Sequence, residues 1–191
     1  MPEIVFVERP RKRKWPWVLG IIGTLCVLCS GLCLAATIPL REQWPARIAA
    51  MPDELAGLRR ERDPLVNLVA AAAEREIRNE QIVDDAFAAM YGDPKSKDRQ
   101  VLVFGATLLI LDPPGELKKA IAGAGKSISE VTPFDEGISC ANGKDDKDKP
   151  IVVCAWIDHG SMGVGLFYGA RSMPASAAWL RALRNEIILR P

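Results

Sequence analysis

A chain of 191 residues is long enough for one folded domain and one additional segment, and too short for two full domains. Its 25 basic and 24 acidic residues nearly cancel, but five of the basic residues and only two of the acidic ones lie in the first 40 positions. The rest of the chain is therefore slightly acidic and mixed in sign. Nucleic-acid binding usually requires a concentrated basic surface, so we expect no nucleic-acid partner.

The segment from Trp15 to Leu40, WPWVLGIIGTLCVLCSGLCLAATIPL, contains no charged residue. About 20 apolar residues in a helix cross the core of a bilayer, and this segment exceeds that length. The basic sequence RPRKRK directly precedes it, and positive charge stays on the cytoplasmic side. We therefore predict a basic cytoplasmic tail over residues 1–14, a single-pass transmembrane helix over 15–40 in the cell membrane, and an extracytoplasmic remainder. A cleaved signal peptide is the alternative, although its apolar core is shorter, about 7–15 residues.

Three cysteines of this segment, Cys26, Cys29 and Cys33, follow the helical spacing i, i+3 and i+7. A metal site, a redox relay or a covalent dimer would fit such a stripe. However, no His, Asp or Glu accompanies the thiols, and metal sites usually have about four ligands. We expect the stripe, with Ser30 beside it, to pack against a membrane helix of a second copy or of another membrane protein.

Residues 41–92 are predicted to form a helical stalk. Asp53 is placed to cap a short helix that runs to Arg62, with acidic residues early and arginines late, as the helix dipole favours. The following stretch, Leu65 to Gly92, is rich in Ala, Leu, Glu and Arg, and its apolar residues recur at helical spacing. The sequence Gly-Asp-Pro at its end is a helix stop signal.

Residues 93–191 are predicted to form an extracytoplasmic α+β domain, with a small, mostly antiparallel sheet and helices packed on one face. The run from Arg99 to Leu111, RQVLVFGATLLIL, is nearly all apolar, which predicts a central strand buried on both faces. A short helix, further strands and an amphipathic C-terminal helix follow it. We expect the first helix at 115–122, the strands at 127–134, 135–140, 150–158 and 163–170, and the last helix at 173–189.

The sequence GAGKS, Gly123 to Ser127, is similar to the end of a phosphate-binding loop. Such a loop has the pattern Gly-x-x-x-x-Gly-Lys-Ser/Thr, after a strand and before a helix. Here Ala120 occupies the position of the first glycine, and the expected helix precedes the motif. We therefore expect no nucleotide and no other cofactor, and we interpret Gly123 or Gly125 as the left-handed residue that ends the helix.

Cys140 and Cys154 are the only cysteines outside the apolar segment. In an oxidising compartment such a pair predicts a disulfide, here between two antiparallel strands. Asp145, Asp146 and Asp148 lie between the two cysteines and suggest a calcium loop. The central glycine and the terminal glutamate of such a loop are missing, so we expect a solvated turn and no metal.

His159 is the only histidine, with Asp158 before it and Ser161 two residues later in CAWIDHGSMG. A hydrolase triad is one interpretation of this segment. Ser161 lacks the Gly-x-Ser-x-Gly elbow, however, and adjacent residues of a strand point to opposite faces. The composition favours a tight turn between two strands, so we assign no catalytic residue.

The combination GISC…PIVVCAWIDHGSMGV, preceded by VLVFGATLLIL, resembles a group of uncharacterised actinobacterial single-pass membrane-anchored proteins with a C-terminal Cys-x-Trp-x-Asp segment. The matching residues are Cys140, Cys154, Trp156, Asp158 and Gly163. The resemblance implies a basic tail, one membrane helix and a C-terminal domain, and it implies no activity.

Together these observations predict a non-enzymatic membrane protein whose outer domain senses, binds or scaffolds a partner. Two alternatives stay open. The first is a membrane-anchored hydrolase that uses His159, Asp158 and Ser161. The second is a thiol-redox component that uses Cys140 and Cys154.

Overall fold

The computed structural model describes residues 41–64, 68, 71–72, 74–75, 83–169 and 171–190. The chain divides into two compact units, Met1–Ile38 and Pro39–Pro191, and all described residues belong to the second unit. The predicted membrane helix over 15–40 lies outside the described residues, together with its cysteine stripe (Cys26, Cys29 and Cys33) and Ser30. Among the residues that are described, no helix is both long enough and apolar enough to cross a membrane.

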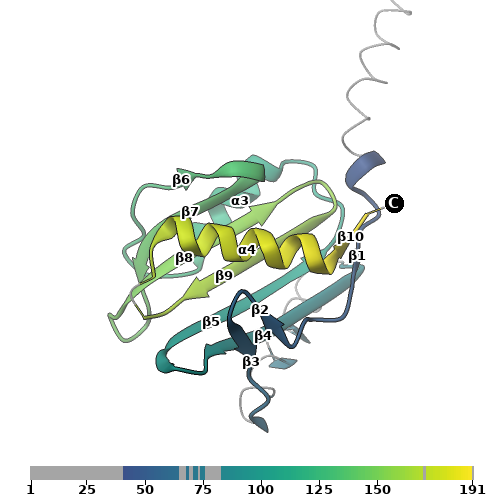
Figure 1. The fold of residues 1–191 in the computed structure, drawn as a ribbon. Helices are drawn as coiled ribbons and strands as arrows, with labels where there is room; N and C mark the ends of the chain where they lie inside the picture. The colour runs from purple at the N-terminus through teal and green to yellow at the C-terminus, as the bar shows by residue number, and fades with distance from the viewer. Residues whose placement is uncertain are drawn as a thin grey trace, which may run out of the picture. The chain divides into compact units, whose positions relative to one another are not determined.

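The second unit is built on one antiparallel sheet of eight strands (Figure 1), in the order β2-β3-β4-β5-β9-β8-β7-β6. These strands are β2 (Glu54–Leu55), β3 (Leu58–Arg60), β4 (Asp85–Asp93), β5 (Ser96–Thr107), β6 (Thr132–Pro133), β7 (Ile138–Lys144), β8 (Pro150–Ile157) and β9 (Ser161–Phe167). A separate pairing joins β1 (Arg47–Ile48) to β10 (Ile188–Leu189). The helices that pack on or beside the sheet within the described residues include α3 (Pro113–Gly123), the 3-10 helix η1 (Asp135–Gly137) and α4 (Met173–Ile187).

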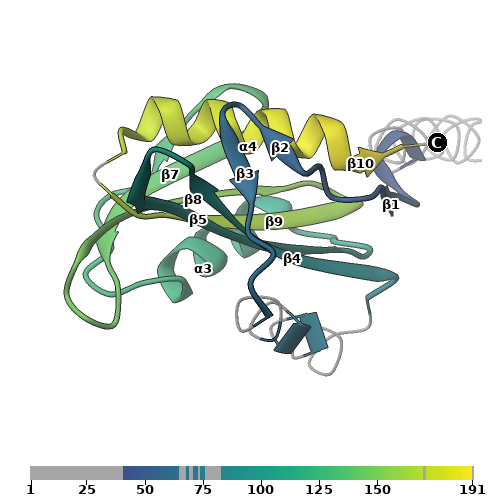
Figure 2. The ribbon, with the colours of Figure 1, turned by 60° about the horizontal axis from the view of Figure 1, so that its bottom comes forward.

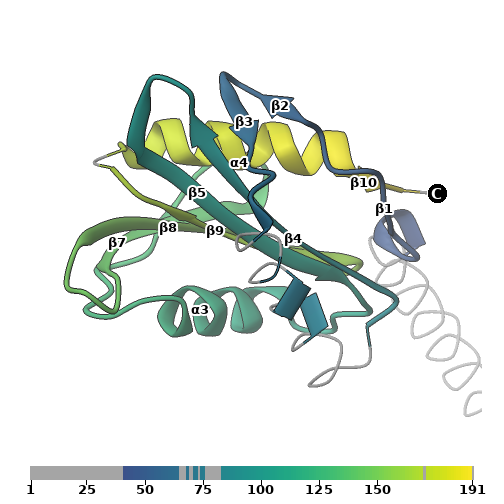
Figure 3. The same ribbon diagram turned by 90° about the horizontal axis from the view of Figure 1, so that it is seen from below.

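The helices α3 and α4 cover opposite faces of the sheet (Figure 3). Strand β8 shows how one strand contacts both helices, because successive side chains of a strand point to opposite faces. Cys154 and Trp156 pack in the apolar cluster that contains α4, whereas Val153 and Ala155 pack in the cluster that contains α3. A strand between two helical layers is buried on both faces, which explains its continuous apolar sequence.

The predicted fold class is therefore wrong. The sheet is large rather than small, the helices pack on both faces rather than one, and much of the predicted helical stalk is strand. Strand β4 shows the reason. Its Ala-rich sequence fits a helix locally, but Phe87, Ala89 and Tyr91 alternate into the cluster with α4, and β5 pairs with the whole strand. Long-range pairing thus overrides local propensity.

The helix predicted from Asp53 to Arg62 is instead the β2–β3 hairpin. Its turn residues Ala56 and Gly57 have φ angles of 47° and 80°, which no helix contains. The charges that suggested a helix dipole pair across the hairpin, with 2.8 Å between Arg62 Nη2 and Asp53 Oδ2. Figure 2 shows β2 beside α4, and there Trp179 donates a 3.1 Å hydrogen bond to the Leu55 carbonyl.

Strand β5 is shorter at its C-terminal end than the apolar run that predicted it. The strand ends at Thr107. After it, the Leu108 amide donates to the Gly160 carbonyl at 3.3 Å, and the Ile110 amide donates to the His159 carbonyl at 3.0 Å. Leu109 and Leu111 are left exposed on this segment, so the prediction of a buried strand up to residue 111 is wrong.

Several local predictions after residue 96 are confirmed. The helices α3 and α4 and the strands β7, β8 and β9 occur close to their predicted places. The tight turn between β8 and β9 is also present. The strand predicted at 127–134 is reduced to β6. Helix α3 ends at Gly123, and its C-cap residue is Ala124, with a right-handed φ of −84°, rather than a left-handed glycine.

The sheet has two distinct ends. At the near end, where the described chain begins, segments 41–48, 107–112, 157–161 and 188–190 meet. The far end carries the turns of the β4–β5 and β7–β8 hairpins and the link from β9 to α4.

Candidate functional site

Asp158 is the buried centre of the near end, with 9% of its surface exposed. Its Oδ1 accepts hydrogen bonds from the amides of Gly160 and Ser161 at 2.9 and 2.8 Å. Its Oδ2 accepts from Arg184 of α4 and from Arg190, both at 2.9 Å. The carboxylate therefore joins the β8–β9 turn to α4 and to the C-terminal segment, and its acceptor sites are occupied by the protein itself.

Arg184 is charged beside this carboxylate although it is largely buried. Burial lowers the pKa of Arg184, Asp158 raises it, and the neighbouring Arg190 lowers it. Because an arginine pKa lies far above neutrality, the guanidinium stays protonated. The arrangement has the character of a structural ion pair rather than of an acid or base prepared for proton transfer.

The three residues of the hydrolase interpretation are only partly brought together. Ser161 Oγ donates to Asp158 at 3.0 Å and accepts from Trp156 Nε1 at 3.2 Å. His159 Nδ1 instead lies 2.8 Å from the backbone carbonyl oxygen of Ile110. Within the described part of the chain, no hydrogen bond joins the His159 ring to Ser161 or Asp158, so the serine lacks an adjacent base.

Cys140 and Cys154 form the predicted disulfide, with 2.07 Å between the sulfur atoms. They are directly opposite each other on β7 and β8, and both are fully buried. A soluble thiol cannot reach this bond while the sheet is intact, and thiol–disulfide exchange requires such access. The geometry fits a structural bond that staples two central strands.

The two motifs from which we expected no ligand binding, the aspartate-rich turn and GAGKS, have structural roles. Asp145 Oδ1 accepts from the amides of Lys147 and Lys149, both at 2.8 Å, and so organises the β7–β8 turn. No group of three or more metal-ligating side chains gathers in the described ranges. In GAGKS, Lys126 pairs with Lys144 of β7 in an isolated antiparallel bridge, so this segment does not open a helix.

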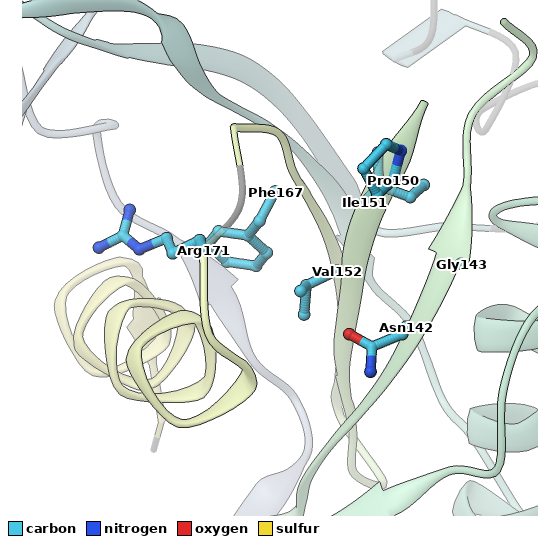
Figure 4. A pocket seen from close by; sticks show the side chains of 7 residues that line it. All are labelled: Asn142, Gly143, Pro150, Ile151, Val152, Phe167 and Arg171. Carbon is cyan, nitrogen blue, oxygen red and sulfur yellow. The ribbon is translucent and has the colours of Figure 1, made fainter. Parts of the chain in front are cut away.

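Arg171, on the link between β9 and α4, has an unusual environment at the far end. It lines two cavities, of about 160 Å³ and about 600 Å³. Asn142, Gly143, Pro150, Ile151, Val152 and Phe167 line the smaller cavity with it. Figure 4 shows Arg171 and Phe167 between α4 and the strands that carry Val152 and Asn142.

The larger cavity is lined mainly by the two hairpin turns and the start of α4. Asp93, Lys95 and Arg99 come from the β4–β5 hairpin, and Ala56, Gly57 and Leu58 come from the β2–β3 hairpin. Ser172 caps α4 here, its Oγ accepting from the Ala175 amide at 3.4 Å. A helix N-terminus carries a partial positive charge, which adds to that of the basic side chains.

The guanidinium of Arg171 is half-buried, and its Cζ lies 5.7 Å from the centre of the Phe167 ring. Among the described residues it makes no hydrogen bond or ion pair with a carboxylate. Burial lowers the pKa of Arg171, and the nearby Arg99 lowers it further, whereas Asp93 raises it. Arg99 itself is only 3.7 Å from Asp93, so one carboxylate faces two arginines. This cluster has an excess of positive charge and room for an anion.

This cluster was not predicted from the sequence. Its members come from three separate segments, and each alone is an ordinary surface residue. One sequence signal was present. Arg171 directly precedes Ser172, and Ser172 with Pro174 two residues later is a helix start, so the sequence places a basic residue at a helix N-terminus.

Comparisons with protein-family models, curated proteins and solved structures found no match to this chain. The resemblance to actinobacterial membrane-anchored proteins therefore stays a prediction. Within the described residues, the fold is a disulfide-stapled domain on an antiparallel eight-stranded sheet, with α4 on one face and α3 on the other. Any function has to be argued from its sites.

Proposed function

We propose that this protein is a single-pass membrane protein whose extracytoplasmic domain binds an anionic ligand at Arg171. The observation that carries the binding role is the half-buried Arg171, which lines two cavities and has to share the charge of Asp93 with Arg99. Two arginines beside one carboxylate are incompletely neutralised, so this site can accept a further anion from outside. Arginine presents a planar fork of donors that suits carboxylate and phosphate oxygens.

The membrane location is supported by the sequence. The uncharged segment from Trp15 to Leu40 has the length of a bilayer span, and the basic tail before it favours a cytoplasmic N-terminus. The buried disulfide between Cys140 and Cys154 is typical of oxidising compartments. Both features favour an outer domain that meets ligands outside the cell.

The geometry favours binding over catalysis. Asp158 and Ser161 are occupied with structural hydrogen bonds, and His159 faces a backbone carbonyl. The Arg171 cavities, by contrast, combine positive charge, an aromatic wall and accessible volume. Such a site can hold and orient an anion, but it contains no nucleophile next to a base.

Isothermal titration of the full-length protein in lipid nanodiscs tests this function, with tetraglutamate and inorganic phosphate as anionic probes and tetralysine as the cationic control. The matched variants are Arg171→Gln and Arg47→Gln, the latter an exposed arginine at the near end. We expect an anionic probe to bind the wild type and Arg47→Gln equally. Binding to Arg171→Gln should be about tenfold to a hundredfold weaker, because a charge-assisted hydrogen bond contributes roughly 1.5–3 kcal/mol. Equal binding by all three proteins, or no binding of either anion, contradicts the proposal.

A further inference from the structure

Exposed large apolar side chains are concentrated at the near end of the sheet. Four of the five that occur among the described residues lie there: Trp44 (37% exposed), Leu109 (46%), Leu111 (78%) and Leu189 (52%). The fifth, Leu68, lies outside the near-end segments. A gathering of exposed apolar side chains on a folded domain indicates a surface that contacts something other than water.

These side chains are held at one place by contacts between segments that are distant in the sequence. Gln43 Oε1 accepts from the His159 amide at 2.9 Å, which fixes the segment that carries Trp44. The amides of Leu108 and Ile110 donate to the turn at residues 159–160, which fixes the segment of Leu109 and Leu111. Leu189 pairs with Arg47 in the β1–β10 ladder. The apolar residues are thus built into the folded end of the sheet.

The structure shows that Leu109 and Leu111, which were predicted to be buried, are not part of the core. The apolar run after residue 100 is longer than the strand it forms, and its last leucines leave the sheet into solvent. Ile110 of this segment is buried, whereas polar side chains at positions 109 and 111 would leave the core unchanged. The apolar character of Leu109 and Leu111 therefore points to a second role.

The position of the near end along the chain identifies the environment that covers it. Trp44 follows Leu40, the last residue of the uncharged segment, by only four residues. Four residues span at most about 14 Å, which is less than half of the roughly 30 Å thickness of a bilayer core. If the segment crosses the membrane, the near end has to stay close to the lipid surface. Tryptophan is enriched at that boundary, where its ring has both apolar and polar surroundings.

Charge does not direct this contact. The exposed charged residues of the near-end segments are mixed in sign: Arg41, Arg47 and Arg190 are basic, and Glu42 and Asp112 are acidic. The exposed Asp84, whose amide donates to the Thr107 carbonyl, lies beside them. An excess of basic side chains, which anionic headgroups would attract, is not present on this part of the described chain. Contact with lipid would therefore rest on apolar side chains and should not depend on anionic lipid.

We propose that the near end of the sheet rests on the outer leaflet of the membrane, with Trp44, Leu109 and Leu111 inserted at the headgroup boundary. This inference depends on the membrane anchor of the proposed function. Tethering keeps the surface at a high effective concentration of lipid, so a few apolar side chains are sufficient to hold it. The far end, with Arg171, then faces away from the membrane.

Site-directed spin labelling tests this docking in the full-length protein, with Cys26, Cys29 and Cys33 replaced by serine. Single labels are placed at Leu111→Cys on the near end, Lys147→Cys on the far end and Leu28→Cys within the predicted span. Each protein is reconstituted in vesicles of phosphatidylcholine alone and of phosphatidylcholine mixed with phosphatidylglycerol. The relative accessibility of each label to oxygen, which partitions into lipid, and to a polar nickel complex is then measured.

We expect the labels at residues 28 and 111 to be accessible to oxygen and shielded from nickel, and the label at 147 to show the reverse, in both lipid mixtures. A label at 111 that is as accessible to nickel as that at 147, while 28 stays in lipid, overturns the docking and leaves the anchor intact. Shielding of 111 from both reagents overturns it in favour of protein contact, such as a second copy. If the label at 28 is accessible to nickel, the anchor and the docking both fail.

Discussion

At the scale of single residues, Asp158 carries the most concentrated set of interactions in the domain. One buried carboxylate accepts from two arginines and from the turn that joins two central strands. This explains the aspartate of the Cys-x-Trp-x-Asp segment without any catalytic role. Trp156 in the same segment donates to Ser161, which in turn donates to Asp158, so the motif forms one hydrogen-bonded unit.

Replacing this carboxylate should therefore destabilise the protein strongly. Asp158→Asn leaves Arg184 beside a neutral amide in a buried site, and breaking a buried pair in this way costs about 3–5 kcal/mol. Urea unfolding of the domain measures the loss of free energy. Asp146→Asn serves as the control, because its side chain is 97% exposed and exposed ion pairs contribute about 0–1 kcal/mol. Equal stability of the two variants would show that Asp158 is not the structural centre described above.

Tyr91 predicts a dependence of stability on alkaline pH. Burial raises the pKa of its phenol to about 12, and its hydroxyl donates to the Pro52 carbonyl at 2.8 Å. Above the unfolded pKa of about 10, the folded state binds more protons than the unfolded state, so the free energy of unfolding falls as pH rises towards 12. The total decrease should be at most about 2.7 kcal/mol. In Tyr91→Phe this part of the decrease should vanish, and an unchanged pH profile would contradict the assignment.

At the scale of elements, local sequence signals identified those parts of the fold that have local causes. Asp112 with its Pro-Pro pair starts α3, and Ser172 with Pro174 starts α4, so both helices were predicted. Strand β4 and the β2–β3 hairpin were not predicted, because their Ala-rich and charge-patterned sequences equally fit a helix. Their state is decided by pairing with β5 and by packing on α4, which a local pattern does not contain. The Arg171 site depends on the same kind of long-range contact.

Two glycines in different elements give opposite predictions. In strand β9, a Cβ on Gly163 would overlap the indole ring of the buried Trp156. Gly163→Ala should therefore destabilise the protein by about 1–3 kcal/mol, as overpacking usually does. In α3, a Cβ on Gly123 meets nothing within 4 Å, so Gly123→Ala should be neutral or slightly stabilising. Thermal unfolding of both variants checks this, and a neutral Gly163→Ala would show that Trp156 is not packed as described.

At the scale of the whole protein, the proposed function requires that the segment from Trp15 to Leu40 crosses a membrane and that the domain lies outside the cell. The near end follows the uncharged segment directly, whereas Arg171 and the hairpin turns lie at the opposite end of the sheet. In the proposed orientation, the end of the domain that carries Arg171 and its two cavities faces the surroundings of the cell. The native Cys140 and Cys154 are unsuitable reporters of location, because both are fully buried in a disulfide.

The most direct measurement of this central claim is labelling of intact cells with a membrane-impermeant maleimide, in a chain whose three cysteines at 26, 29 and 33 are serines. One variant carries Lys147→Cys in the exposed β7–β8 turn, and the other carries Arg13→Cys in the basic tail. The account predicts that the cysteine at 147 is labelled in intact cells and that the cysteine at 13 is labelled only after lysis. Labelling of 147 only after lysis would place the domain in the cytoplasm and contradict the proposed function.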